Sequence, residues 1–251
     1  MKHAVIFTVL LLCSPSLYSQ SIQDLISEAD NYSAVTFENQ KALDKLLQAE
    51  KIDQNNFNML WRMSRSYVDI GEHLPNKTDA EKEKQLEYYQ KAFDYADKAV
   101  KSKPDSTIGY IRRAIANGRV ALFKGVWSAI DLVKQVKADC EKAISLDPND
   151  GAAYYILGRT HAKLCEKSKI IRWPLGLGWA NMKESLQYYD KSIALRPTFI
   201  LYRLDAARAY NTEENTAKAK DLLISIAALP KQDEDDDQYR KEARELLEKL
   251  Q

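Results

Sequence analysis

One sequence motif occurs three times in this chain of 251 residues. The stretch "CEKAISLDPNDGAAYYILGR" (140–159) is closely similar to "DKAVKSKPDSTIGYIRRA" and to "DKSIALRPTFILYRLDAA". In each copy a run with helically spaced apolar residues ends before a proline, at Pro104, Pro148 or Pro197, and a second such run follows. Self-similarity of this kind indicates an array of related structural units.

Small residues mark one face of the helix that precedes each turn. Gln54 in "EKIDQNN" is taken as the counterpart of the prolines, and the positions five and twelve residues before each turn are nearly all Ala or Ser. A spacing of seven places both positions on one helical face, where small side chains let a neighbouring helix approach closely. The positions are Ala42, Ala49, Ala92, Ala99, Val136, Ala143, Ser185 and Ser192.

Each unit is predicted to be a helical hairpin. Six residues after the first three turn positions stand Leu60, Tyr110 and Tyr154, each of which opens a new run of helically spaced apolar residues. Proline lacks an amide donor and ends a helix, so each turn separates two helices. The chain has only eight glycines and seven prolines, which also favours helix. We expect an all-α superhelix of about four hairpins, with a C-terminal capping helix over residues 236–250.

The repeated residues resemble the tetratricopeptide repeat, in which an aromatic residue, a Leu-Gly pair, two small residues and a proline recur. In the third unit they are Tyr154, Leu157, Gly158, Ser185, Tyr189, Ser192 and Pro197. The turn positions are 50, 44 and 49 residues apart, whereas the usual repeat has about 34 residues. The excess predicts extended helices or ordered loops inside each hairpin, including a Trp-bearing insertion at 168–182.

The order of these motifs is more specific than the repeat alone. From "LWRMSRSY" through "YYILGR" and the Trp-bearing insertion to "SLQYYDKSIALRPTF", the chain resembles the regulator of microtubule dynamics family and exported bacterial proteins that share its repeat domain. The resemblance covers Ser21 to Gln251 and implies one tetratricopeptide-like domain at 21–251. Animal members of the family are membrane-associated and reported to bind microtubules. For an exported chain we expect the architecture, and not this ligand, to carry over.

Residues 1–20 are predicted to be a secretory signal peptide. The apolar run from Ala4 to Leu12 is too short to span a bilayer, and the bulky Leu12 before Cys13 disfavours lipoprotein anchoring. We therefore expect an exported bacterial protein, periplasmic or secreted, with no transmembrane span after removal of the signal. A disulfide between Cys140 and Cys165 and two separate thiols are both compatible with the sequence.

No residue pattern indicates catalysis or a metal site, so we expect no enzyme and no cofactor. The 37 basic and 36 acidic side chains nearly balance, which argues against a nucleic-acid partner. Asp233, Asp235 and Asp237 alternate as in a calcium-binding loop, but the glycine and glutamate that such a loop requires are absent. We interpret this acidic run as a solvated capping segment, and His161 as a packing residue with a satisfied ring nitrogen.

A strip of arginines indicates a binding surface. In repeats of this kind the first helix of each hairpin lines the concave face, and eleven residues after three of the four turn positions stands an arginine. A guanidinium group can bind both oxygens of a carboxylate, so the strip predicts a protein or peptide partner with acidic groups. The predicted partner-binding residues are Arg65, Arg159 and Arg208, supported by Arg62, Arg112 and Tyr155.

Our main hypothesis from the sequence is an exported, non-enzymatic scaffold that binds a protein or peptide partner in its concave groove. In a second interpretation the arginines pair with acids of neighbouring helices, such as Asp69, Asp131 and Asp205, and only hold the stack together. In a third, the chain is a structural adaptor of a cell-envelope complex and uses Trp173 and Trp179 of the insertion. A microtubule-associated role, implied by the family resemblance, is set aside because of the expected export.

Overall fold

The structure is a computed structural model that describes residues 20–125 and 128–250. Within these residues it has twelve α-helices and no strand, so the predicted all-α fold is confirmed. Except for Gln20, the predicted signal peptide lies outside the described residues. The helices are α1 (Ile22–Ala34), α2 (Asn39–Glu50), α3 (Phe57–His73), α4 (Asp79–Ser102), α5 (Thr107–Lys124), α6 (Ile130–Leu146), α7 (Gly151–Cys165), α8 (Lys169–Arg172), α9 (Met182–Leu195), α10 (Ile200–Thr212), α11 (Thr216–Ile226) and α12 (Asp236–Lys249).

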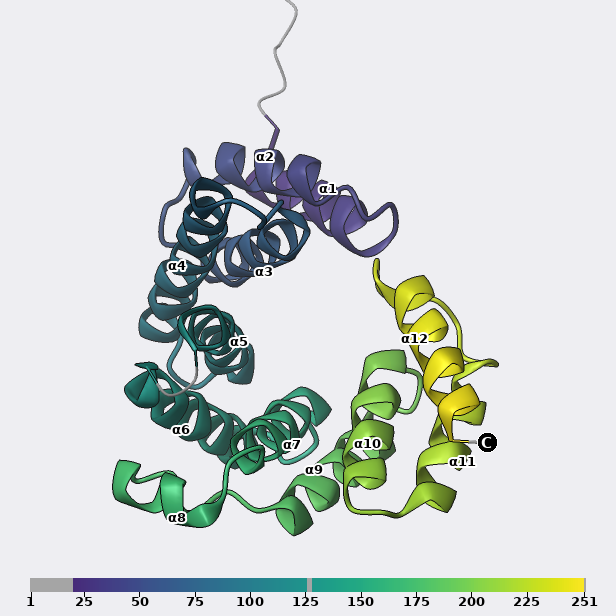
Figure 1. Cartoon of the computed structure of the whole chain (residues 1–251). Helices are drawn as coiled ribbons and strands as arrows, with labels where there is room; N and C mark the ends of the chain where they lie inside the picture. The colour runs from purple at the N-terminus through teal and green to yellow at the C-terminus, as the bar shows by residue number, and fades with distance from the viewer. Residues whose placement is uncertain (1–19, 126–127, 251) are drawn as a thin grey trace, which may run out of the picture.

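Consecutive helices pack in pairs and curve around a central space (Figure 1). The pairs α3–α4, α5–α6, α7–α9 and α10–α11 are the four predicted hairpins, and α12 packs on α10 and α11 as the predicted cap. At the N-terminal end α1 pairs with α2, of which only α2 carries the repeated small residues. In Figure 1 helices α3, α5, α7 and α10 face the inside of the curve, whereas α4 and α6 lie on its outside.

The small residues predicted at helix contacts are buried, and the contact between α7 and α9 shows why they are small. The Ser185 hydroxyl donates a hydrogen bond of 2.7 Å to the carbonyl oxygen of Gly158. A Cβ atom on Gly158 would lie 3.2 Å from the carbonyl oxygen of Ser185 and 3.2 Å from the ring of Tyr189. The two backbones are therefore too close for a larger residue at position 158 to fit without displacing a neighbour.

The extra residues of the first and third hairpins differ in form. In the first hairpin they lengthen α4, which has 24 residues and begins with a capping box between Thr78 and Glu81. Between α7 and α9 they form α8 and a short 3-10 helix (Trp173–Leu175), and the buried guanidinium of Arg172 donates to the carbonyls of Leu177 and Ala180. This arrangement leaves Trp173 73% exposed at the outer edge.

His161 and the cysteines are packing residues. The His161 ring is buried against Trp179, with 4.9 Å between ring centroids, and its Nδ1 accepts a hydrogen bond of 3.2 Å from the backbone N–H of Asn181. The prediction for His161 is thus confirmed. Cys140 and Cys165 are free thiols, which decides against a disulfide.

Across the described residues, none of the helices combines the length and apolar character needed to cross a bilayer.

Candidate functional site

The inner side of the curve encloses a central cavity of about 530 Å³. Its lining comes mainly from α3, α5, α7 and α10, and also from the end of α1 and from residues 232–236, which lead into α12. Apolar side chains such as Val68, Ile115 and Leu201 alternate with charged ones along this lining. A cavity of this volume is in the range of ligand pockets and holds a short chain segment, not a folded domain.

Four of the six predicted binding residues line this cavity, and two do not. Arg65, Arg112, Tyr155 and Arg159 contribute to the lining from α3, α5 and α7. They share it because all four stand on the first helices of three successive hairpins, which face the inside of the curve (Figure 1).

Arg62 and Arg208 lie outside the cavity lining, and each pairs with an acid of a neighbouring helix. Arg62 donates two hydrogen bonds, of 2.8 and 2.7 Å, to the carboxylate of Asp30 on α1. Arg208 donates to Asp205 at 2.8 Å and also pairs with Glu242 of the capping helix. For these two residues the geometry is that of the structural interpretation, in which arginines hold the stack together.

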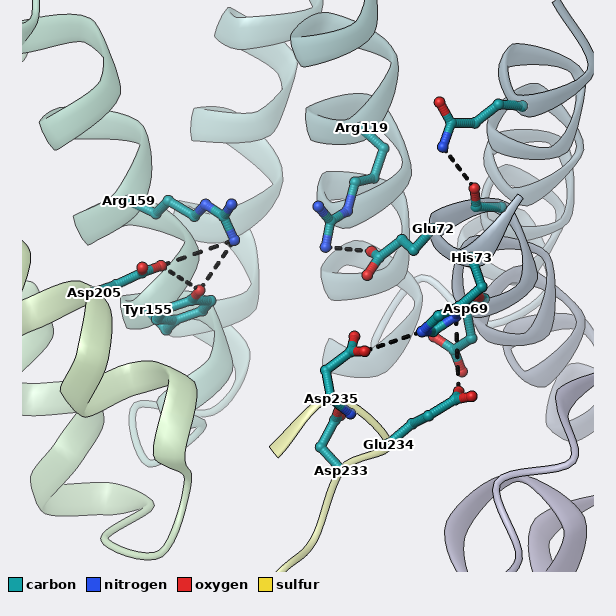
Figure 2. Close-up of polar contacts among 12 residues, drawn as sticks. Asp69, Glu72, His73, Arg119, Tyr155, Arg159, Asp205, Asp233, Glu234 and Asp235 are labelled. Carbon is teal, nitrogen blue, oxygen red and sulfur yellow. Dashed lines mark hydrogen bonds and ion pairs between the residues drawn. The ribbon is translucent and has the colours of Figure 1, made fainter. Parts of the chain in front are cut away.

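Arg159 belongs to a polar cluster that joins α7 to α10 (Figure 2). The Tyr155 hydroxyl donates to Asp205 at 2.8 Å, and Arg159 donates to the Tyr155 oxygen at 3.1 Å and lies 3.9 Å from the carboxylate. Burial first, and then the charge of Asp205, raise the pKa of Tyr155 well above its usual range. The cluster therefore keeps a neutral phenol and a weakly paired guanidinium at the cavity wall.

Arg65 and Arg112 lie on the α3–α5 side of the cavity with few partners. Arg65 pairs with Asp30 at 3.1 Å, and its buried Nε has no hydrogen-bond partner. The buried Nε of Arg112 also has none, and burial together with the nearby charge of Arg65 lowers the pKa of Arg112 to about 10. Burial raises the pKa of Asp69 to about 7, although both guanidinium groups oppose this rise. Asp131, the other acid expected to pair, is exposed and lies 4.0 Å from Lys134.

The acidic run before α12 reaches across to the N-terminal helices and closes the cavity on that side (Figure 2). We call residues 232–236, which line the cavity, the closing segment. Glu234 accepts a hydrogen bond of 2.6 Å from the Asn39 side chain on α2. Asp235 accepts one of 3.0 Å from His73 Nε2 at the end of α3, and Glu234 lies 3.7 Å from the same ring. The segment is thus more than the solvated cap predicted from the sequence.

Sequence reasoning missed this closure and several ion pairs around the cavity. The pairs His73–Asp235 and Arg119–Glu72 connect different helices, and the first joins residues 162 positions apart. The alternating acids of the segment were a visible signal, but nothing near them in the sequence indicates a histidine on the third helix as their partner.

We expect the contribution of His73 to stability to depend on pH. Burial lowers the pKa of this imidazole, but Asp235, the Asp69 carbonyl and the charge of Glu234 outweigh burial and raise it to about 9 from the ordinary 6.5. A raised folded-state pKa gives stability that is complete below pH 6.5 and is lost as the pH rises through about 9. Since the side chain is 40% exposed, solvent screening reduces the effect to about 1 kcal/mol.

The measurement compares the free energy of unfolding of the wild type and of His73→Gln across this pH range. The difference should shrink as the pH rises, whereas the loss caused by Asn39→Ala, which removes a contact without a titrating group, should stay constant. Glu72 and Asp233 also lie near the ring. Both acids are present in the wild type and in the variants, so their titration cancels in the differences in free energy as long as each variant keeps the fold. An NMR titration that gives His73 a pKa below 7 would contradict the described contacts.

The sequence matches known proteins along almost its whole length. A profile described as Regulator of microtubule dynamics protein 1-3 matches residues 25–251. Regulator of microtubule dynamics protein 3 of Rattus norvegicus is 26% identical over 237 residues, which are 90% of this chain and 49% of that protein. Regulator of microtubule dynamics protein 1 of Bos taurus is 26% identical over 235 residues, which are 90% of this chain and 71% of that protein. The chain spans about half the length of the first of these relatives.

Solved structures place the fold among tetratricopeptide-repeat proteins. TTC0263, a thermophilic TPR protein in Thermus thermophilus, superposes with a TM-score of 0.66 at 15% identity, covering 89% of this chain and 99% of that one. The pilF protein of Pseudomonas aeruginosa gives a TM-score of 0.53 at 13% identity, covering 91% and 88%. At such identities the likeness shows the fold alone. The predicted tetratricopeptide-like superhelix is confirmed.

The expected location is wrong. The sequence led us to expect an exported bacterial protein, periplasmic or secreted, but the curated proteins that match are vertebrate regulators of microtubule dynamics. The expectation depended on residues 1–20, nearly all of which lie outside the described part of the chain. The apolar run there has the pattern of a secretory signal, but the relatives do not support that interpretation. The profile match over residues 25–251 shows instead that this chain belongs to the Regulator of microtubule dynamics protein 1-3 family.

Proposed function

We propose that this chain is a non-enzymatic protein-binding scaffold whose central cavity holds a short acidic segment of a partner protein. The observation that carries the proposal is the cavity itself, about 530 Å³ on the concave face, with Arg65, Arg112, Tyr155 and Arg159 in its lining. A stack of helical hairpins presents side chains from several repeats to one ligand, so that affinity comes from many modest contacts. Arg62 and Arg208 support the walls through their ion pairs.

The mixed lining favours a peptide over a purely ionic ligand. Apolar residues from α5, α7 and α10, such as Ile115, Ile156 and Leu201, are only partly buried and offer surface that gains from being covered. The guanidinium groups between them fix the position and charge of what is bound, because each prefers a planar acidic group. A protein segment that alternates apolar and acidic side chains meets both requirements.

A variant that fills the cavity tests the proposal. Gly118 on α5 lines the cavity, and a Cβ atom added there would meet no atom within 4 Å. Gly118→Phe is therefore expected to fold and to occupy the space, which weakens peptide binding by about tenfold or more, whereas Gly118→Ala leaves binding intact. Both should be more stable than the wild type, Gly118→Ala by about 1 kcal/mol, because glycine is a poor residue within a helix.

The measurement selects binders of the wild-type chain from a random peptide library displayed on phage. The dissociation constants of the selected peptides are then measured for the two Gly118 variants. Peptides that bind Gly118→Phe as tightly as the wild type would place binding outside the cavity. Failure to select any peptide would count against the proposal as well.

A role in microtubule regulation is a second candidate, favoured by the names of the vertebrate relatives. It was set aside because of the expected export, and that reason no longer holds. Co-sedimentation with assembled microtubules tests this role in the wild type and in the two Gly118 variants. If Gly118→Phe and the wild type sediment alike, the cavity is not the contact; if neither sediments, this chain alone does not bind the polymer.

A further inference from the structure

One cation in the cavity lining differs from all the others. Within the described part of the chain, Arg112 has neither an ion pair nor a hydrogen bond from its guanidinium group, although it lines the cavity. Every other lining cation has an acidic partner: Arg65 with Asp30, His73 with Asp235, Arg119 with Glu72, Arg159 with Asp205, Lys163 with Glu166 and Arg196 with Asp150.

The surroundings make this lack of a partner costly. The Nε atom of Arg112 is buried, and a buried donor without an acceptor loses the hydrogen bonds that water would give it. The positive charge of Arg65 lies close enough to disfavour the charge of Arg112 further. Asp69 offsets part of this charge from a distance, but the two residues form no ion pair. An anion placed beside Arg112 would supply what is missing.

We propose that Arg112 anchors one carboxylate of the bound protein segment, and that the residues next to this carboxylate are apolar. The inference rests on the proposed function and names the chemistry of its ligand. A carboxylate is chosen because its two oxygens match the guanidinium fork. Apolar neighbours are chosen because Ile108 and Ile115, which lie four residues before and three after Arg112 on α5, are partly exposed and also line the cavity.

The closing segment shows that acidic groups on a protein chain reach this cavity. Asp233, Glu234 and Asp235 of the chain itself lie in its lining, facing the same space as Arg112. Glu234 accepts a hydrogen bond from Asn39, and Asp235 accepts one from His73. Asp233 accepts one from the backbone N–H of Asp235, so the anchor stays available. A free small anion would meet the charge but leave the apolar wall uncovered, and for this reason we assign the site to a protein segment.

The test uses pairs of short fluorescein-labelled peptides that carry either one glutamate or one glutamine between leucines. Fluorescence anisotropy with the wild-type chain should give tighter binding for the glutamate peptide, by about 10- to 100-fold. Arg112→Met keeps the apolar stem of the side chain and should abolish this preference. Arg244→Met, which removes an exposed guanidinium of α12 outside the cavity lining, should preserve it, and Arg112→Lys should restore part of it.

The outcomes are separable from those of the proposed function. The role of Arg112 is wrong if glutamate and glutamine peptides bind the wild type alike. It is also wrong if Arg112→Met keeps the preference for glutamate while its melting temperature is unchanged. In either case, loss of peptide binding in Gly118→Phe would still support the cavity as the binding site. If Arg112→Met does not fold, the comparison of the two peptides on the wild type and on Arg112→Lys decides. Binding of hexanoate at this site without binding of any peptide would overturn the assignment to a protein segment.

Discussion

Replacing Arg113 with methionine is expected to lower the free energy of unfolding by about 3 kcal/mol. Arg113 on α5 donates hydrogen bonds of 2.9 and 2.7 Å to Asp139 on α6, and another of 2.7 Å to Asp97 on α4. The Asp139 side chain is only 2% exposed, so removal of the guanidinium would leave its charge buried without a counter-charge, with only the amide of Gln135 as a side-chain donor. Loss of one partner from a buried ion pair costs about 3–5 kcal/mol, and the 15% exposure of Arg113 favours the lower end.

Urea unfolding followed by circular dichroism measures this loss. Lys137→Met is the matched control, since Lys137 pairs with Glu141 at an exposed site and its removal should cost less than about 0.5 kcal/mol. Replacing Asp139 with leucine in the Arg113→Met background should restore much of the stability, because no buried charge is left. A loss of less than about 1 kcal/mol in the single variant would mean that water reaches Asp139 and the bridge is not structural.

Most of the fold and part of the cavity wall could be predicted from the repeat. The first helix of each hairpin faces the inside of the superhelix, so Arg65, Arg112 and Arg159 were predicted together on the inner helices, where they lie. Repeat position alone does not decide which of them line the cavity, because Arg208, at the same repeat position as Arg159, lies outside it. The small residues were predictable from local spacing as well. Two helices that approach as closely as α7 and α9 leave no room for a Cβ atom at Gly158 opposite Ser185.

The partners of these side chains were not predictable in the same way. Arg62 pairs with Asp30 on α1, a helix without the repeat signature, and Arg208 pairs with Glu242 on the capping helix. The closure of the cavity depends on how small rotations between successive hairpins add up over the whole stack. The spacing of residues in the sequence does not give the accumulated rotation, so the contact of Asp235 with His73 could be found only in the three-dimensional structure.

Tyr189→Ala is expected to cause the other large loss, about 3–5 kcal/mol in the free energy of unfolding. Tyr189 on α9 is 2% exposed, and its ring lies against the backbone of Gly158 on α7. The ring also lies 6.1 Å from that of Tyr155, between centroids, so its removal would open a void beside a residue of the cavity wall. Truncation of a large buried aromatic residue loses both the burial of apolar surface and the packing contacts around the space left behind.

Tyr188→Ala provides the control for this variant. The Tyr188 ring is only half-buried, against Tyr154 and His161, so its removal should lower the free energy of unfolding by less. Chemical denaturation of both variants gives the comparison. Since Tyr155 would lose one of the two tyrosine rings it packs against and keep only that of Tyr202, Tyr189→Ala should also weaken peptide binding while still folded, whereas Tyr188→Ala should not. Equal losses of stability in the two variants would contradict the packing of α7 on α9 through Gly158, and with it the tetratricopeptide geometry that sets the curvature of the cavity wall.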